Sequence, residues 1–345
     1  MSQRQLTKDS QARTLRGWML GLHATHIIDV GGRLGYFSAL RQRDGRATAA
    51  ELATAHDLDP WRTAVWCKAA CTVGILRATD ETADTAYSFA PFMDELLADN
   101  APDLLTSHVL ASLSRDYPGY PEAFRTGATK TFHDHDEDFF AHQGRISALR
   151  APLILAAARQ LPGVEERLSA GGTIMDIGSG SGTVLVSFAE AFPGCQVIGI
   201  EPLPYFVHSS RQRLAERGLA QRVRVESVGG EGMDFAQTAD LITMVQVFHE
   251  LPDTEKIAIL HRCHHALKPG GSLLLVDRCA PESAQDIQDR RFSMSILEQW
   301  FEVTWGNIVN TRSEILAMLG QTGFSVSQEN PDMVPTYWSF VANKG

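Results

Sequence analysis

The run Thr173-Ile-Met-Asp-Ile-Gly-Ser-Gly-Ser-Gly182 predicts the architecture of the larger part of the chain. Its first half is an apolar strand, its second half is a glycine-rich turn, and residues 183–191 continue as a helix. Glycines at such a turn let the backbone approach a ligand closely, and the N-terminus of the helix adds a favourable dipole. The run therefore predicts a strand, turn and helix arranged around a ligand site.

The residues around this turn distinguish two kinds of nucleotide site. The glycines follow G-x-G-x-G, and Thr183 stands where the third glycine of a dinucleotide fingerprint would be. Asp176 precedes the first glycine by two residues, and Glu201 ends the second strand, where a carboxylate can accept two ribose hydroxyls. An NAD-linked dehydrogenase is the alternative interpretation of this strand, turn and helix. The pattern of glycines and carboxylates favours a different nucleoside cofactor.

From residue 172 onward, apolar strands alternate with helical segments, which predicts an α/β fold. Each of the first four strands is followed by a helix, so we expect a largely parallel, seven-stranded, Rossmann-like sheet covered on both faces. In such sheets ligands bind at the carboxyl ends of the strands. The strands are expected near 173–177, 196–201, 222–226, 240–246, 272–277, 324–328 and 336–342.

Residues 1–105 lack a long strand and predict a mainly helical, winged-helix-like domain. One helix is capped near Thr48, an Asp-Pro turn at 59–60 begins the next, and short β-like pieces follow at 75–78 and 86–90. A winged helix suggests DNA binding, but residues 1–105 hold 11 Lys and Arg against 13 Asp and Glu. We therefore expect a dimerisation domain, followed by a helical connector over the active site at 106–165.

Composition narrows the classes of partner. A formal net charge of −10 over 345 residues is repelled by phosphate backbones, so we expect no nucleic-acid partner. There is no apolar run of membrane-spanning length and the N-terminus is too polar for a secretory signal, which predicts a cytoplasmic protein without a membrane partner. The five scattered cysteines, without a C-x-x-C, predict reduced thiols.

The motifs D-I-G-S-G-S-G at 176–182 and G-I-E-P at 199–202 resemble the cofactor motifs of class I S-adenosylmethionine-dependent methyltransferases. Residues 249–277, with Lys-Pro-Gly-Gly at 268–271, resemble the later motifs of that family. With the winged-helix pattern in front, the chain resembles the small-molecule methyltransferases that dimerise through their N-terminal domain. The resemblance implies a homodimer, with residues 166–345 as the methyltransferase domain.

The same resemblance implies the residues that bind S-adenosylmethionine. The glycines of the turn line the methionine part, Asp176 holds that edge, Glu201 takes the ribose, and the turn after the third strand borders the adenine. Gln246, at the end of the fourth strand, is assigned to the cofactor as well. The predicted cofactor-binding residues are Asp176, Gly178, Gly180, Gly182, Glu201, Gly232, Met233, Asp234 and Gln246.

The segment Gln246-Val-Phe-His-Glu-Leu-Pro-Asp253 follows the fourth strand, where the methyl group must be delivered. In the resembled family a histidine at this place is the general base of O-methyltransferases. A hydroxyl that attacks a methyl sulfonium must lose its proton, and imidazole has a suitable pKa for that step. We therefore predict His249 as the base. Glu250 replaces the family's usual aspartate and is the second predicted catalytic residue, which leaves the partner of His249 open.

The connector holds three further histidines, His133, His135 and His142, among acidic residues. One interpretation is a charged surface loop; another places them at the acceptor, with His133 or His135 joining His249 around a metal ion. A metal that chelates a 2-oxo acid would stabilise its enolate, and carbon would then be methylated. Some α-keto acid C-methyltransferases share this overall fold. Trp305, Asn307 and Arg312 are also predicted to meet the acceptor, with Arg312 taking a carboxylate.

The sequence thus predicts an S-adenosylmethionine-dependent methyltransferase acting on a hydroxyl or enol of a small organic molecule in specialised metabolism. Methylation of an α-keto acid at carbon, with a metal ion, is the alternative. A winged-helix regulator that senses S-adenosylmethionine is a more distant one.

Overall fold

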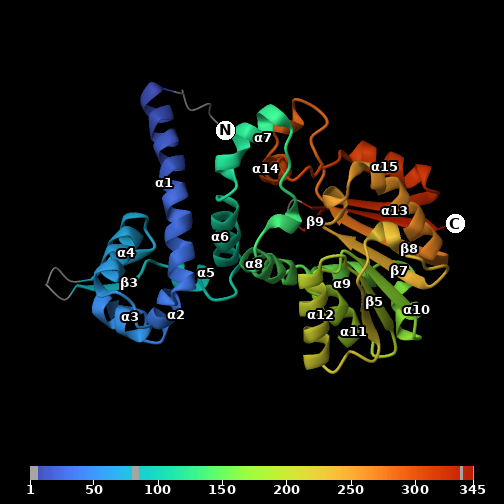
Figure 1. Cartoon of the computed structure of the whole chain (residues 1–345), viewed down its shortest axis with the longest axis horizontal. Helices are drawn as coiled ribbons and strands as arrows, with labels where there is room; N and C mark the ends of the chain where they lie inside the picture. Colours follow the sequence, from blue (N-terminus) through green and yellow to red (C-terminus); the bar gives the residue numbers. More distant parts are fainter. Residues whose placement is uncertain (1–6, 80–84, 335–336, 345) are drawn as a thin grey trace. The chain divides into compact units, whose positions relative to one another are not determined.

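The computed structural model describes residues 7–79, 85–334 and 337–344, except for the side chains of residues 133 and 332–334. The chain divides into two compact units, Met1–Pro118 and Gly119–Gly345 (Figure 1). The predicted connector, 106–165, is divided between them, because its first helix belongs to the first unit and the later ones to the second. Within the described ranges, no helix combines the length and the apolar character needed to cross a membrane.

The first unit combines helices with a small antiparallel sheet of order β1-β3-β2. The helix pair α3–α4 followed by strands β2 and β3 forms the helix-turn-helix and wing that the sequence predicts. The elements are α1 (Lys8–Arg33), α2 (Tyr36–Arg41), β1 (Arg46–Thr48), α3 (Ala49–Ala55), α4 (Pro60–Thr72), β2 (Leu76–Ala78), β3 (Ala86–Phe89), α5 (Met93–Leu96) and α6 (Pro102–Leu113).

Capping side chains fix the ends of this helix pair. The Thr48 side chain accepts the backbone N–H of Glu51, which completes a capping box at the start of α3. Asp59 accepts the N–H of Arg62 at 2.8 Å, and a proline occupies the first turn of α4. Strand β1 was not predicted, because its three residues adjoin a stretch whose apolar spacing is helical.

The second unit contains a seven-stranded sheet of order β6-β5-β4-β7-β8-β10-β9, which confirms the predicted α/β fold. The strands from β6 to β8 are mutually parallel, and β10 is antiparallel to both of its neighbours. The strands are β4 (Thr173–Ile177), β5 (Gln196–Ile200), β6 (Val223–Glu226), β7 (Ala239–Val245), β8 (Leu267–Asp277), β9 (Phe324–Val334) and β10 (Tyr337–Lys344).

Helices cover both faces of this sheet (Figure 1). Ile174 packs with α9, α10, α11 and α12, whereas its neighbour Met175 packs with α13 and α15, as the alternation of a strand requires. The α-helices of this unit are α7 (Tyr120–Thr126), α8 (Glu137–Ala148), α9 (Ala151–Arg159), α10 (Val164–Ser169), α11 (Thr183–Ala191), α12 (Pro204–Glu216), α13 (Asp253–Ala266), α14 (Ser293–Glu302) and α15 (Arg312–Gln321). Short 3-10 helices are η1 (Tyr117–Gly119), η2 (Phe132–Asp134), η3 (Gly230–Gly232), η4 (Phe248–Glu250), η5 (Asp286–Gln288) and η6 (Arg290–Phe292).

The strand order reverses between β4 and β7. From β4 the chain proceeds to β5 and β6 in one direction, and then returns to the other side of β4 with β7 and β8. In open α/β sheets the crevice at such a switch point, at the carboxyl ends of the strands, is where ligands bind. The fold therefore directs attention to the residues that follow Ile177 and Val245.

Candidate active site

The glycine turn after β4 packs tightly on two sides and is open at its centre. Gly178, Gly180 and Gly182 have φ angles of 67°, 52° and 76°, a region that favours glycine. A Cβ at Gly178 would lie 2.3 Å from the Val247 side chain, and one at Gly182 would lie 2.2 Å from Ser210. At Gly180 the nearest atom to such a Cβ is 3.9 Å away. The turn therefore offers open space beside its central glycine, which fits a close-lying cofactor.

Glu201 follows β5 and faces the same turn. Its Oε2 accepts the N–H of Gly180 at 2.8 Å, and its Oε1 accepts the N–H of Leu203 at 2.9 Å. Burial raises the pKa of this carboxyl, and the two N–H donors act in the opposite direction. Because each carboxylate oxygen can accept a second hydrogen bond, Glu201 can still bind the two ribose hydroxyls that the sequence assigned to it.

Asp176 ends β4 beneath the turn, and its carboxylate accepts the Thr243 hydroxyl at 2.6 Å. Burial, with a contribution from the nearby charge of Glu201, raises the pKa of Asp176 to about 7. Two buried carboxyls therefore lie at adjacent strand ends, where a positively charged or hydroxyl-rich ligand would stabilise them.

The remaining predicted cofactor residues are more varied in position. Gly232 and Asp234 are exposed, whereas Met233 between them is buried in the apolar cluster that contains residues of α13, so its side chain belongs to the core. Gln246 has a φ of 56° and donates from Nε2 to Asp277 at 3.0 Å.

His249 is 3% exposed and is held by Asp277, at the end of β8. The Asp277 carboxylate accepts the backbone N–H of His249 at 3.1 Å and lies 2.7 Å from Nδ1. A hydrogen on Nδ1 bonded to Asp277 leaves Nε2 as the atom that can take a proton. Asp277 is therefore the orienting partner of His249. The one sequence signal for it is an aspartate that ends a strand at the same edge of the sheet.

Further carboxyls surround Nε2. Glu302 lies 3.5 Å from this atom and Glu250 lies 4.0 Å from it. Burial by itself lowers the pKa of His249, but the charges of Asp277 and Glu302 outweigh it and raise that pKa well above 6.5. Burial raises the pKa of Glu250, which the nearby His249 opposes. The carboxylates around the ring therefore favour the protonated form of the imidazole.

Glu298 completes the group. It is buried, contacts the Arg278 guanidinium, and burial raises its pKa. Within the described part of the chain, one group of three potential metal ligands was found, and its ligand atoms on His249, Glu298 and Glu302 lie within 4.8 Å of one another. His135, which the sequence paired with His249, is not in this group.

An aromatic cluster covers the same edge of the sheet. Helix α8 approaches the glycine turn, since a Cβ at Gly144 would lie 3.2 Å from the Ser181 side chain. From α8, the Phe140 ring lies 5.4 Å from Tyr205. The cluster consists of Phe132, His135, Phe139, Phe140, Tyr205, Phe206 and Trp305.

The three connector histidines have different surroundings. His135 stacks on Phe139 with ring centres 4.4 Å apart, and its Nδ1 donates to the Phe132 carbonyl. The Nδ1 of the buried His142 donates to the Asp138 carbonyl at 2.7 Å within α8. The side chain of His133 lies outside the described side chains. His135 is thus part of the aromatic cluster, and His142 is bonded within its own helix.

The three C-terminal residues that were predicted to meet the methyl acceptor also lie in different surroundings. Trp305 is buried in the aromatic cluster, and Asn307 donates to Glu302 Oε2 at 3.0 Å. Arg312 lies at the start of α15, where it forms two hydrogen bonds to Glu329 of 2.7 and 3.0 Å. The structure therefore brings Asn307 to the group around His249, whereas the Arg312 guanidinium is engaged with β9.

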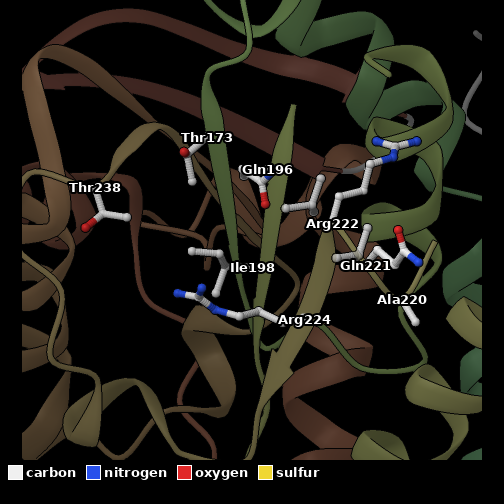
Figure 2. A pocket seen from close by; sticks show the side chains of 10 residues that line it. Thr173, Gln196, Ile198, Ala220, Gln221, Arg222, Arg224 and Thr238 are labelled. Atoms are coloured by element: carbon white, nitrogen blue, oxygen red, sulfur yellow. The ribbon is translucent and has the colours of Figure 1, made fainter. Parts of the chain in front are cut away.

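A pocket of about 200 Å³ lies at the amino ends of the parallel strands, away from the glycine turn (Figure 2). It is lined by Thr173, Gln196 and Val223, the first residues of three parallel strands. Because the carboxyl ends of these strands point the other way, this pocket is separate from the glycine turn and from His249.

Comparison with known families places the chain. The family model of the O-methyltransferase domain matches residues 107–325 of this chain. Aclacinomycin 10-hydroxylase RdmB of Streptomyces purpurascens is 33% identical over 45% of this chain and 40% of its own length. A mitomycin biosynthesis 6-O-methyltransferase of Streptomyces lavendulae is 30% identical over 47% of this chain and 44% of its own length. The chain thus spans less than half the length of either relative in these alignments.

Among solved structures, human N-acetylserotonin methyltransferase in complex with S-adenosylmethionine superimposes with a TM-score of 0.77. The match covers 100% of both chains at 17% identity, which shows a shared fold. With the family match over residues 107–325, the chain belongs to the O-methyltransferase domain family.

Proposed function

We propose that this enzyme methylates a hydroxyl group of a small aromatic acceptor, with His249 as the general base. One observation carries the proposal: Asp277 fixes Nδ1 of a buried histidine. Its Nε2 is thereby left as the proton acceptor. His249 follows Val247, which packs against the glycine turn, by two residues. A base beside the methyl donor is what attack by a hydroxyl oxygen needs.

S-adenosylmethionine supplies an electrophilic methyl group on a sulfonium. The open space at Gly180 and the free acceptor positions of Glu201 fit its nucleoside and methionine parts. In the reaction His249 Nε2 takes the proton of the acceptor hydroxyl. Asp277 and Glu302, one at each ring nitrogen, stabilise the imidazolium that results.

The aromatic cluster supports an aromatic acceptor. Its rings cover the carboxyl edge beside α12, and flat aromatic molecules pack well against such surfaces. The relative from Streptomyces lavendulae is named for O-methylation in mitomycin biosynthesis, which favours an acceptor from specialised metabolism. Aclacinomycin 10-hydroxylase, another relative, is named for a different reaction, so the products must be analysed directly.

We also propose a homodimer formed through the first unit, in the cytoplasm. Helix α1 exposes a row of large apolar side chains, whose burial would be favourable. All five cysteines are free thiols, in keeping with a reducing compartment. The exposed apolar residues of α1 include Leu15, Trp18, Met19, Leu20 and Leu22.

The group formed by His249, Glu298 and Glu302 supports a second candidate, C-methylation of a 2-oxo acid. Imidazole and carboxylate oxygens are ligands for transition-metal ions. A metal held there would supply Lewis-acid stabilisation of an enolate, and His249 would then be a ligand instead of a base.

Gly180→Val should weaken binding of S-adenosylmethionine by about 10- to 100-fold, since an overpacked site costs about 1–3 kcal/mol. The valine would occupy the open space beside the turn. Gly270→Val is the matched control, because Gly270 also has a positive φ and open surroundings but lies at the start of β8. Calorimetry with the cofactor checks this, and equal affinities of the two variants would contradict the assigned site.

His249→Ala should leave cofactor binding intact and lower turnover by about a hundredfold or more, because the proton acceptor is lost. Turnover is measured with methyl-labelled cofactor and a panel of phenols. His261→Ala, at an exposed histidine of α13, is the control and should resemble the wild type. Wild-type turnover in His249→Ala would remove the base from the mechanism.

The pH profile should report the raised pKa of His249. Because the unprotonated imidazole is the base, kcat rises with pH and its inflection lies above 6.5. Asp277→Asn removes a charge that raises this pKa, so the inflection should move to lower pH. The partly exposed Asp289 supplies the control variant Asp289→Asn. Profiles are recorded in the presence of a chelator, and an inflection that does not move would argue against this pair.

Complete chelation should leave methyl transfer to a phenol unchanged, because the proposed O-methylation uses only His249 and its carboxylates. Product mass and the position of the label are determined for phenols and 2-oxo acids, before and after chelation. Methylation of a 2-oxo acid at carbon that disappears with the metal would replace the first candidate by the second.

A further inference from the structure

Lys256, in α13, is a fully buried lysine that the proposed chemistry does not use. Its Nζ donates to Asp253 Oδ1 at 2.8 Å, to the Ile308 carbonyl at 3.1 Å and to Asn310 Oδ1 at 2.7 Å. These acceptors match the three N–H donors of an ammonium group. The group also lies 5.4 Å from the centre of the Phe248 ring. A buried charge of this kind is costly unless its bonds are complete, so the geometry around it is well defined.

Two of these acceptors belong to residues 303–311, which we call the return segment because it follows α14 back to the edge of the sheet. The N–H of Ile308 in this segment donates to the His249 carbonyl at 3.1 Å. Lys256 therefore holds the return segment at the point where it meets the backbone of His249.

The return segment is bonded in turn to α14. The N–H of Val309 donates to Gln299 Oε1 at 2.7 Å, and Gln299 Nε2 donates to the Asn307 carbonyl at 2.9 Å. Asn307 Nδ2 donates to Glu302 Oε2 at 3.0 Å, and this oxygen is 3.5 Å from His249 Nε2. An unbroken set of contacts thus joins Lys256 to the carboxylate that faces the reacting nitrogen.

We propose that Lys256 is a positioning residue that, through Asn310 and the Ile308 carbonyl, keeps Glu302 beside His249 Nε2. The proposal rests on the proposed function of His249 and Glu302. It assigns to an ammonium group of α13 the task of fixing a carboxylate of α14, two helices that are far apart in the sequence. Glu302 stabilises the His249 imidazolium only at short range, because the electrostatic attraction between the carboxylate and the ring falls with distance.

Two variants test this from opposite sides. Lys256→Met removes the donors and keeps the length of the side chain, and Asn310→Leu removes one acceptor while Lys256 remains. Lys268→Met is the matched control, because Lys268 also pairs with an aspartate, Asp240, but lies at the start of β8.

Hydrogen exchange of the full-length protein provides a measurement that needs no acceptor. The amides of Ile308 and Val309 should exchange faster in both variants than in the wild type and the control, while the amides of β7 keep their rates. Unchanged exchange of these two amides in Lys256→Met overturns the proposal.

Kinetics separates positioning from a purely structural effect. In Lys256→Met, kcat for the identified acceptor should fall about tenfold, with an unchanged Kd for S-adenosylmethionine. If Lys256 acts through Glu302, Lys256→Met should have little further effect once Glu302 is replaced. The kcat of the double variant Lys256→Met, Glu302→Gln should therefore be within about twofold of that of Glu302→Gln alone. If the fall in kcat of the double variant equals the product of the falls in the two single variants, the role of Lys256 in positioning Glu302 is overturned. If no phenol is methylated by the wild type, the proposed function fails, and the exchange rates still decide whether Lys256 holds the return segment.

Discussion

The close contact between Gly178 and Val247 is the constraint on which the rest of the site depends. A Cβ at Gly178 would lie 2.3 Å from Val247, so only glycine allows the turn after β4 to meet the segment after β7. These two strands are parallel neighbours at the point where the strand order reverses. Because the turn and the segment touch, the proposed cofactor site and His249 share one edge of the sheet.

Much of this arrangement could be predicted from local sequence. The strand ends carry Asp176 and Glu201, and the glycines between them show a turn with positive φ angles. The five parallel strands, β4 to β8, are predictable because buried parallel strands are short apolar runs with clear breaks. Strand β1 was missed because three residues are too few to establish a period, and strand β8 begins five residues earlier than 272 because Lys268-Pro-Gly-Gly271 resembles a turn.

The contacts of His249 were less predictable, because they join elements that are distant in the sequence. Asp277 ends a strand, as Asp176 does, and this pattern was available as a signal. Glu298 and Glu302 lie four residues apart on a helix, where a carboxylate pair is ordinarily a solvated face, and only packing shows that both are buried. Arg312 was predicted from its charge to meet an acceptor, but a charge alone does not reveal that Glu329 of β9 already accepts its hydrogen bonds.

The balance of charge at this edge connects the proposed chemistry to the cofactor. The carboxyls of Asp277, Glu302, Glu298 and Glu250 surround His249, whereas Arg278 is the cation that contacts Glu298. Buried negative charge in excess is costly. Burial raises the pKa values of Glu250 and Glu298, so protonation of these carboxyls would relieve part of that cost. A bound cation at this edge would relieve it too, so a sulfonium or a metal ion competes with protons for the same carboxylates. Binding of a cationic ligand should therefore release protons from this group, which makes the group around His249 a receptor for positive charge as well as a base.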